Sequence, residues 1–553
     1  MGILNTISFR SMVAASLVGL AACSGGGGGG NSVGGGSSPV APPPPPPPPT
    51  SSDPTWTAGV YEAASSFEQR CENPRSGVDI EGNAFVDVQG STTIENFWLR
   101  SWTEETYLWN DEVTDRNPAN FSNRLDYFAL LRTTAVEPSG EDRDDFHFSQ
   151  STEEFLRSRN SAGTASYGFS LEAIRTSPPR DYRIRYVDPD TPAAEEIAGQ
   201  QQFERGSRIL AIDGADLVNG SALDILNAGL FPATAGETHT FDLRDADGTE
   251  RTISITSADL SRKPVLQTEV INTPSGKVGY IVFNTFSPFA SEEEIIEAVE
   301  TLAAENIVDL VLDLRYNGGG LLAVASQLSY MIAGPAFTDG KIFETLQFND
   351  DAGNRNPVTG EINDPVPFYE TALGFSTTPG VALPRLDLSR VFILSTSGTC
   401  SASEAVVNGL TGIDFQVVLI GDITCGKPYG FYPTDNCGET YYTIQFAGVN
   451  DKGFGDYADG FVPNDSTFAF GARLPGCTVQ DDLSFALGDT NEPLLSAALN
   501  YRLTDSCPVP TTSGGTPKAQ SNLAIDKSQA LRQETLSLME TNRDMTLPEG
   551  DRL

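Results

Sequence analysis

The chain has 553 residues and a formal net charge of −39 at pH 7. So acidic a surface argues against binding to nucleic acid or to anionic lipid, and suits solubility in a salty medium. The length allows several domains.

Residues 1–22 have the pattern of an export signal. One positive charge, Arg10, precedes an apolar segment that is too short for a comfortable transmembrane helix. The run Leu20-Ala21-Ala22-Cys23 resembles a bacterial lipobox, in which small residues precede a Cys that is lipidated after cleavage. We therefore expect a signal peptide and a lipid anchor on Cys23, with an unlipidated signal peptide as the alternative. By resemblance to lipoprotein sorting, Ser24 favours the outer membrane, facing the periplasm or the exterior.

Residues 23–55 are a linker by composition. Two glycine runs form a flexible coil, and the eight prolines at 42–49 form a stiff polyproline spacer. Neither composition can build a core. The simplest interpretation is a tether that holds an exported protein away from a membrane.

Residues 56–160 predict a small N-terminal helical region. Its stretches alternate polar and aromatic residues, as in Ile94–Leu99 and Tyr127–Leu131, and we expect these aromatic side chains in a core rather than in a ligand site.

Residues 161–260 resemble a PDZ domain. Tyr167, Gly168, Phe169 and Ser170 stand where that family has its carboxylate-binding loop, and 206–214 matches its strand-and-turn pattern. The resemblance implies a groove helix at Ala222–Leu230, and two further strands flank an Asp247-Gly248 turn. A PDZ groove adds a peptide as an extra strand and captures its terminal carboxylate. The alternative is a module that only packs on its neighbour.

Residues 264–507 alternate strands and helices, which predicts an α/β core. The expected strands are 278–284, 307–314, 390–395, 416–420 and 441–447, and the expected helices are 291–305, 320–332 and 401–411. Residues 508–553 are a polar tail with a helix pattern at Leu523–Glu540.

Ser401 follows an apolar β-branched run and a small-residue turn, and it opens a helix-compatible stretch. A serine there faces the positive end of a helix dipole, which suits a nucleophile. The structural alternative is a capping box of Ser401 and Glu404.

A serine nucleophile needs a base. The chain has only two histidines, and both precede Ser401, whereas the α/β-hydrolase order places His after Ser. His147 lies in what we expect to be a solvated acidic loop, and His239 lies in a Thr-rich strand pattern. Lys427 follows an apolar strand and is fixed between Gly and Pro; in an apolar site its pKa would fall, so that it could act as a general base. The alternative for Lys427 is an ordinary surface turn.

Three segments together resemble the C-terminal processing peptidases, the tail-specific serine proteases of family S41. They are Leu312–Gly320, similar to LDLR-x-N-x-GG; Gly398–Glu404, similar to the nucleophile segment; and Gly426-Lys427, at the position of the catalytic lysine. The resemblance covers roughly 160–500. It implies a crotonase/ClpP-like core with a preceding or inserted PDZ-like domain, and it implies neither metal nor other cofactor.

The resemblance assigns roles to particular residues. Ser401 would be the nucleophile, Lys427 its base, and Glu404 a residue that orders the site. The backbone N–H groups of Ala402 and of the Gly318–Gly319 turn would stabilise the oxyanion. In one departure, Phe431 stands where the family often has a Gln that orients the lysine, so another group must do so here.

Cysteine use indicates an oxidising compartment. With Cys23 lipidated, six remain, which allow 15 pairings; one hypothesis is a bridge between Cys425 and Cys437 around the Lys427 loop. Without a CxxC pair and with so few histidines, a metal site is disfavoured. Cys400 lacks a His-type partner and is disfavoured as the nucleophile.

The leading hypothesis is therefore an exported serine endopeptidase with a Ser–Lys dyad. It would cleave extracytoplasmic proteins or peptides near their C-termini, so its substrates would have accessible C-termini. The alternatives are a catalytically inactive PDZ-type adaptor or chaperone at the cell envelope, and an acidic surface scaffold, which would leave the Ser, Lys and Gly segments unexplained.

Overall fold

The computed structural model describes residues 53–508 and 543–544. The expected signal peptide, the lipidation site Cys23, nearly all of the linker and the helix pattern at Leu523–Glu540 lie outside these residues. Within the described part of the chain, no helix is both long and apolar enough to cross a bilayer.

A six-stranded sheet forms the centre of the fold, in the order β14-β15-β16-β20-β21-β28. The first two strands form an antiparallel hairpin, and every later pair is parallel. The strands are β14 (Val265–Thr273), β15 (Gly276–Phe283), β16 (Asp309–Asp313), β20 (Arg390–Ser395), β21 (Gln416–Gly421) and β28 (Gly476–Thr478).

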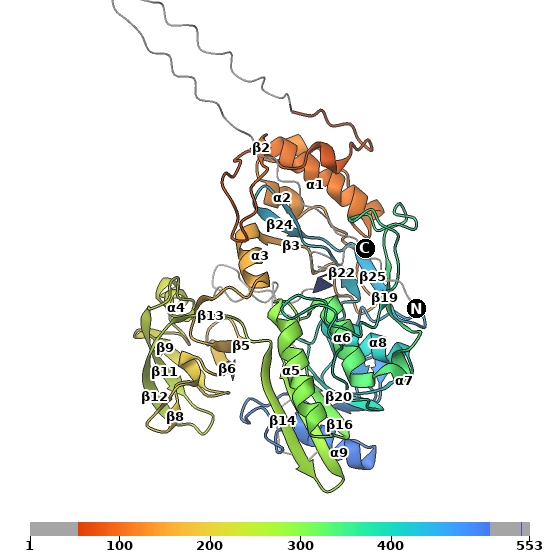
Figure 1. The fold of residues 1–553 in the computed structure, drawn as a ribbon. Coiled ribbons are helices and arrows are strands. Elements are labelled where there is room, and N and C mark those ends of the chain that lie inside the picture. The colour runs from red at the N-terminus through yellow and green to blue at the C-terminus, as the bar shows by residue number, and fades with distance from the viewer. Residues whose placement is uncertain (1–52, 509–542, 545–553) are drawn as a thin grey trace, which may run out of the picture. The chain divides into compact units, whose positions relative to one another are not determined.

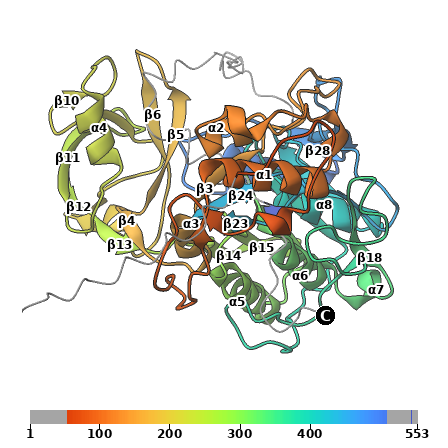
Figure 2. The same ribbon diagram turned by 90° about the horizontal axis from the view of Figure 1, so that it is seen from above.

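Helices cover both faces of this sheet, which explains its continuous apolar strands. Alternate side chains, such as Leu312 and Ile393, pack with α5 (Ala290–Ala304), α6 (Leu322–Ala333) and α8 (Ala402–Gly412). Their neighbours along the strands pack with α9 (Pro493–Thr504) on the other face. Figure 1 shows α5 alongside β14, and Figure 2 shows α5 next to α6.

The strands and helices predicted for this core are confirmed to within two residues at their ends, with one exception. The expected strand 441–447 is two strands, β24 (Glu439–Tyr442) and β25 (Phe446–Val449), in different sheets. The prediction was wrong because one apolar run serves two partners. Thr443–Gln445, buried between them, ends one pairing before the next begins.

The segment 161–260, which resembles a PDZ domain, forms a separate sheet with the strand order β12-β11-β9-β6-β5. We call this segment the β-rich domain. The predicted helix is present as α4 (Leu223–Leu230), and the Asp247-Gly248 turn joins two antiparallel strands. The strands are β5 (Phe169–Arg175), β6 (Asp181–Val187), β9 (Arg208–Ile212), β10 (Ala215–Asp216), β11 (Thr238–Arg244) and β12 (Glu250–Thr256).

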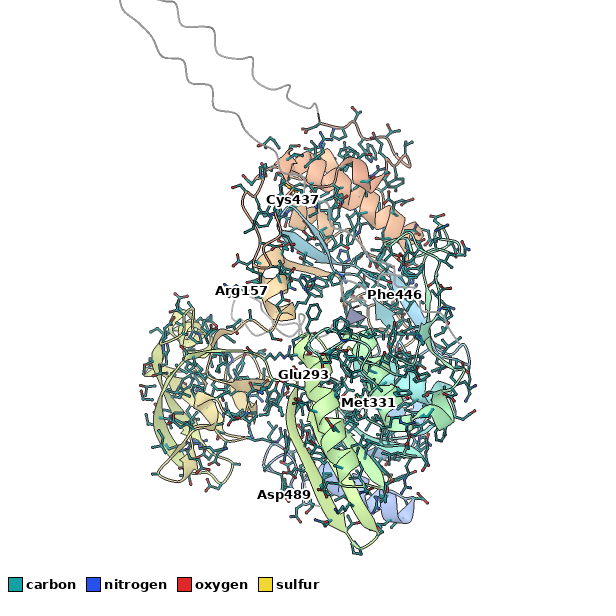
Figure 3. All side chains as sticks on the ribbon, viewed as in Figure 1. Arg157, Glu293, Met331, Cys437, Phe446 and Asp489 are labelled. Atoms are coloured by element: carbon teal, nitrogen blue, oxygen red, sulfur yellow. A yellow bond between two sulfur atoms is a disulfide. The ribbon has the colours of Figure 1, made fainter. Side chains whose placement is uncertain are left out.

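The N-terminal region contains the helices α1 (Thr92–Thr106), α2 (Arg124–Phe128) and α3 (Thr152–Arg159). The aromatic side chains of the stretches Ile94–Leu99 and Tyr127–Leu131 are buried in one cluster, as predicted, and the cluster also includes Tyr441. Tyr107 is buried in a second cluster with Phe431. The region is joined to the C-terminal half by pairing of β3 (Phe148–Ser151) with β24 and by the disulfide Cys71–Cys437 (Cys437 is labelled in Figure 3).

The remaining elements are short and lie mostly at edges and connections. They are α7 (Pro335–Thr338), β1 (Arg70–Cys71), β2 (Val88–Gln89), β4 (Thr164–Ser166), β7 (Glu196–Ile197), β8 (Gln200–Gln201), β13 (Ala258–Leu260), β17 (Gly320–Leu321), β18 (Ile342–Gln347), β19 (Val366–Pro367), β22 (Tyr429–Gly430), β23 (Thr434–Asn436), β26 (Phe461–Pro463), β27 (Ala472–Leu474) and β29 (Arg543–Asp544).

The Cys71–Cys437 bridge closes a chain separation of 366 residues, whereas Cys477–Cys507 closes one of 30. Since a cross-link restricts the unfolded chain more when the loop is longer, C71A/C437A should lose more stability than C477A/C507A, by about 2 kcal/mol. Urea unfolding of both double variants beside the parent measures this difference. Equal losses would contradict this account of the bridge.

Candidate active site

Ser401 sits where the central strand β20 turns into α8. Its backbone has φ 59° and ψ −111°, a conformation that side chains with a Cβ rarely adopt. Such strain persists only where the surroundings enforce it, and it clusters at functional sites. The Ser401 residue is fully buried, and its hydroxyl oxygen has no hydrogen-bond partner among the described residues. The turn therefore presents a buried, unengaged hydroxyl at the start of a helix.

Glu404 ties the start of α8 to the loop after β21. Its carboxylate accepts hydrogen bonds from the backbone N–H of Ser401 (2.9 Å), of Gly426 (2.8 Å) and of Lys427 (2.8 Å), and from the Thr424 hydroxyl (2.6 Å). Burial raises the pKa of Glu404, although these four donors act in the opposite direction.

This carboxylate brings the two predicted catalytic residues together. The amides of Ser401 and Lys427 bond to the same oxygen, so the two nitrogens lie within about 6 Å of each other. The predicted capping box is present in geometry, with Glu404 bonding the Ser401 amide. The second hydrogen bond of the capping box, which the Ser401 hydroxyl would accept, does not have normal geometry.

Lys427 is fully buried, as expected for a lysine in an apolar site rather than in a surface turn. Its Nζ lies 4.5 Å from the ring centroid of Phe431 and 4.5 Å from that of Phe146. Aromatic faces attract an ammonium and pack against the lysine stem. Phe431, which replaces the family's Gln, thus contacts the lysine directly. Gly426 precedes it at φ 83°, where a Cβ would lie 2.0 Å from the Ala458 carbonyl oxygen.

A disulfide braces the same two segments. Cys400, next to Ser401, is bonded to Cys425, two residues before Lys427. The hypothesis of a Cys425–Cys437 bridge is therefore wrong, because Cys437 pairs with Cys71 instead. Sequence proximity was misleading here, since Cys437 lies beyond β23 in the turn that leads into β24. As a disulfide, Cys400 is also not a free thiol.

The glycine turn after β16 lies against the Ser401 turn. Asn317 O accepts hydrogen bonds from the Cys400 amide (3.0 Å) and from the Ser403 hydroxyl (2.9 Å). Within the described residues, the N–H groups of Ala402 and Gly318 have no acceptor, which suits an oxyanion site. The Gly319 N–H already donates to Asn317 Oδ1 at 2.9 Å, so it is less available to an oxyanion than the other two predicted donors.

A buried ion-pair cluster holds this turn. Arg315 is fully buried and contacts Asp313 (2.8 Å), Asp481 (2.7 Å) and Glu492 (2.9 Å). These carboxylates raise the pKa of Arg315 well above its ordinary value, despite the opposing effect of burial. Asp481 also pairs with Arg205 of the β-rich domain at 2.6 Å. The cluster therefore reaches from that domain to the residues beside the glycine turn.

The sequence did not single out Phe146, Asp481 or Glu492. Phe146 reaches Lys427 from far along the chain, and the two acids lie in polar stretches with no motif of their own. The only signal was the Arg of the LDLR-type motif, because a buried Arg requires a charged partner. That signal does not indicate which acid is the partner.

Neither histidine is brought to Ser401 by any contact among the described residues. The expectation that His147 lies in a solvated loop was wrong: its side chain is 1% exposed, stacked on Phe128 and bonded to Thr443. Burial lowers the pKa of His147. His239 lies in β11, as expected, and contacts Asp213 at 2.6 Å.

The segment predicted to bind a peptide carboxylate opens strand β5. Tyr167 is buried and donates to Gly229 O of α4, while the Gly168 amide donates to the Ser166 hydroxyl. Phe169 and Ser170 pair with β6. Since β5 ends its sheet, its other edge is not paired with any described strand.

Three groups of close sulfur and carboxylate atoms have ligand-like spacing within the described residues. Each consists of one disulfide pair with one acid, namely Glu95, Glu404 or Asp465. These cysteines would offer thiolate ligands only after reduction.

A comparison with known protein families agrees with this geometry. Residues 277–431 match the model described as peptidase family S41. The chain carries an S41 peptidase domain. The match includes the glycine turn, Ser401, Glu404 and Lys427.

Two relatives agree with this assignment. The carboxyl-terminal-processing protease of Picosynechococcus sp. is 30% identical over 247 residues, which cover 43% of this chain and 49% of the relative. The chain thus matches about half of that protein. A solved Bacteroides fragilis structure described as an S41 protease has a TM-score of 0.55 at 24% identity, covering 74% of this chain and 97% of that one. This second likeness shows the S41 protease fold.

Replacing Glu404 with Gln tests its role in the S41 domain. Gln has nearly the same shape, but its amide group would face N–H donors that now meet a carboxylate. We expect the relative position of Ser401 and Lys427 to shift and kcat to fall by roughly 100-fold.

Glu292 of α5 offers a matched control. It too is fully buried, and its carboxylate accepts several backbone amides, such as those of Leu373 and Phe375, away from Ser401. E292Q should lose similar thermal stability yet keep kcat near the parent value. An equal loss of kcat in both variants would refute the positioning role of Glu404.

Proposed function

We propose that this protein is a serine endopeptidase whose catalytic pair is Ser401 and Lys427. One observation carries the proposal. A buried serine hydroxyl in a strained turn at a helix start and a buried lysine are tied, through backbone amides, to the same carboxylate oxygen of Glu404. The S41 family match supports the same chemistry.

In the proposed reaction, Ser401 Oγ attacks the carbonyl carbon of a peptide bond while Lys427 Nζ takes the hydroxyl proton. The N–H groups of Ala402 and Gly318 stabilise the oxyanion, aided by the positive end of α8. Lys427 then gives the proton to the departing amine. Water hydrolyses the resulting ester and restores both residues.

The substrates we propose are extracytoplasmic proteins or peptides with accessible C-termini. This class is supported by the similarity to a carboxyl-terminal-processing protease and by three disulfides, which are typical of oxidising compartments. We also propose an export signal and a lipid anchor at Cys23, which would hold the enzyme at the cell envelope, in an outer membrane.

A second function is favoured by one observation of its own. The unpaired edge of β5, beside α4 in one apolar cluster, offers a place for a peptide strand in the manner of a PDZ groove. If Ser401 were inert, the protein would act as a peptide-binding adaptor or chaperone. Labelling by a fluorophosphonate, which requires a reactive serine, separates the two functions.

We expect S401A and K427A each to lower the turnover of an unstructured peptide by roughly 1000-fold or more, because each removes a reacting group. Circular dichroism checks that both variants stay folded. The controls S397A and K341A change an exposed serine of the same turn and a lysine paired with Asp451, and should remain active. Parent-like activity in S401A or K427A would refute the dyad.

A further inference from the structure

Strand β29 shows that a distant part of the chain reaches the candidate active site. Arg543 and Asp544 pair in parallel with Gly320 and Leu321 of β17, directly after the glycine turn. The same two residues lie against β22, which begins two residues after Lys427. In Figure 1, β29 is the short dark-blue arrow beside β22. It thus lies between the segment that follows the proposed oxyanion turn and the segment that follows the proposed base.

The β17 strand has two edges, and β29 takes the one that the rest of the domain leaves open. On the first edge, the Leu321 amide donates to Phe286 O at 3.1 Å, and the Phe286 amide donates to Gly319 O at 2.8 Å. Gly320 is also closed on that side, where a Cβ would lie 2.2 Å from the Phe286 backbone. Only the second edge can add a strand, and β29 occupies it.

We propose that the open edge of Gly320–Leu321 is the strand-binding part of the substrate site, and that its resident ligand is this chain's own segment around Arg543–Asp544. The ligand class is an extended peptide backbone, held by strand addition. This inference rests on the proposed function, because the segment can compete with a peptide substrate only if Ser401 cleaves peptides.

Chain length supports a resident ligand. The roughly 35 residues between Cys507 and Arg543 can span up to about 100 Å, so the segment reaches β17 within one molecule. A ligand that belongs to the same chain has an effective concentration on the order of millimolar, so even weak pairing fills the edge for much of the time.

Two proline residues test the pairing in the full-length chain. Proline removes the backbone N–H and fixes φ, so R543P/D544P should release the segment. R543A/D544A removes the same two side chains but keeps both N–H groups, and it should keep the segment bound. For an unstructured peptide, we expect the apparent KM of the proline variant to fall at least about twofold with kcat unchanged.

A binding measurement separates this inference from the proposed function. In an S401A background, a fluorescein-labelled peptide of residues 538–549 should bind the proline variant at least about twofold more tightly than it binds the alanine variant or S401A alone. This readout needs no catalysis. Equal affinities across the three proteins would overturn the inference and leave the dyad intact, whereas full turnover by S401A itself would overturn the dyad instead.

Discussion

The carboxylate of Glu404 is the constraint on which the site depends. A buried carboxylate needs several donors to offset its lost hydration, and those available are amides at the start of α8 and in the loop after β21. Satisfying Glu404 therefore fixes the distance between two loops that the sheet alone would leave adjustable. The Cys400–Cys425 bridge fixes the same pair of loops covalently. The hydrogen bonds that satisfy the buried Glu404 carboxylate thus also set the geometry of the proposed catalytic pair.

The parallel sheet explains why these loops meet. β16, β20 and β21 are neighbours and run the same way, so the glycine turn, the Ser401 turn and the Lys427 loop all leave one edge of the sheet. Hydrogen bonds from Thr399 and Ser403 to the backbone of the glycine-turn segment then lock two of them together. Arg315 belongs to that segment and is held by ion pairs with three carboxylates. One of them, Asp481, also pairs with Arg205 of the β-rich domain. A movement of the β-rich domain would therefore be transmitted through Asp481 to Arg315, two residues before Asn317.

Local signals in the sequence predicted the parts of this site that local physics determines. The apolar run ending at Leu394 and the Ser401-x-x-Glu404 spacing predicted β20 and α8, because both depend on near neighbours. The disulfides were not predictable, since pairing Cys71 with Cys437 depends on how β3 meets β24. Phe146 was missed, and His147 misjudged, for the same reason: their acidic neighbours suggested solvent, but the tertiary fold buries the His147 ring and packs the partly buried Phe146 ring against Lys427.

The geometry of β17 bears on what this site can accept. Two residues of backbone edge, one of them a glycine packed against Phe286, offer hydrogen bonds but little side-chain contact. Such an edge binds a strand by its main chain and tolerates many sequences, while it demands that the chain be extended. Folded loops rarely present an extended, unpaired backbone, but flexible chain ends do. A preference for tails would then follow from the backbone edge itself, even before the β-rich domain makes any selection.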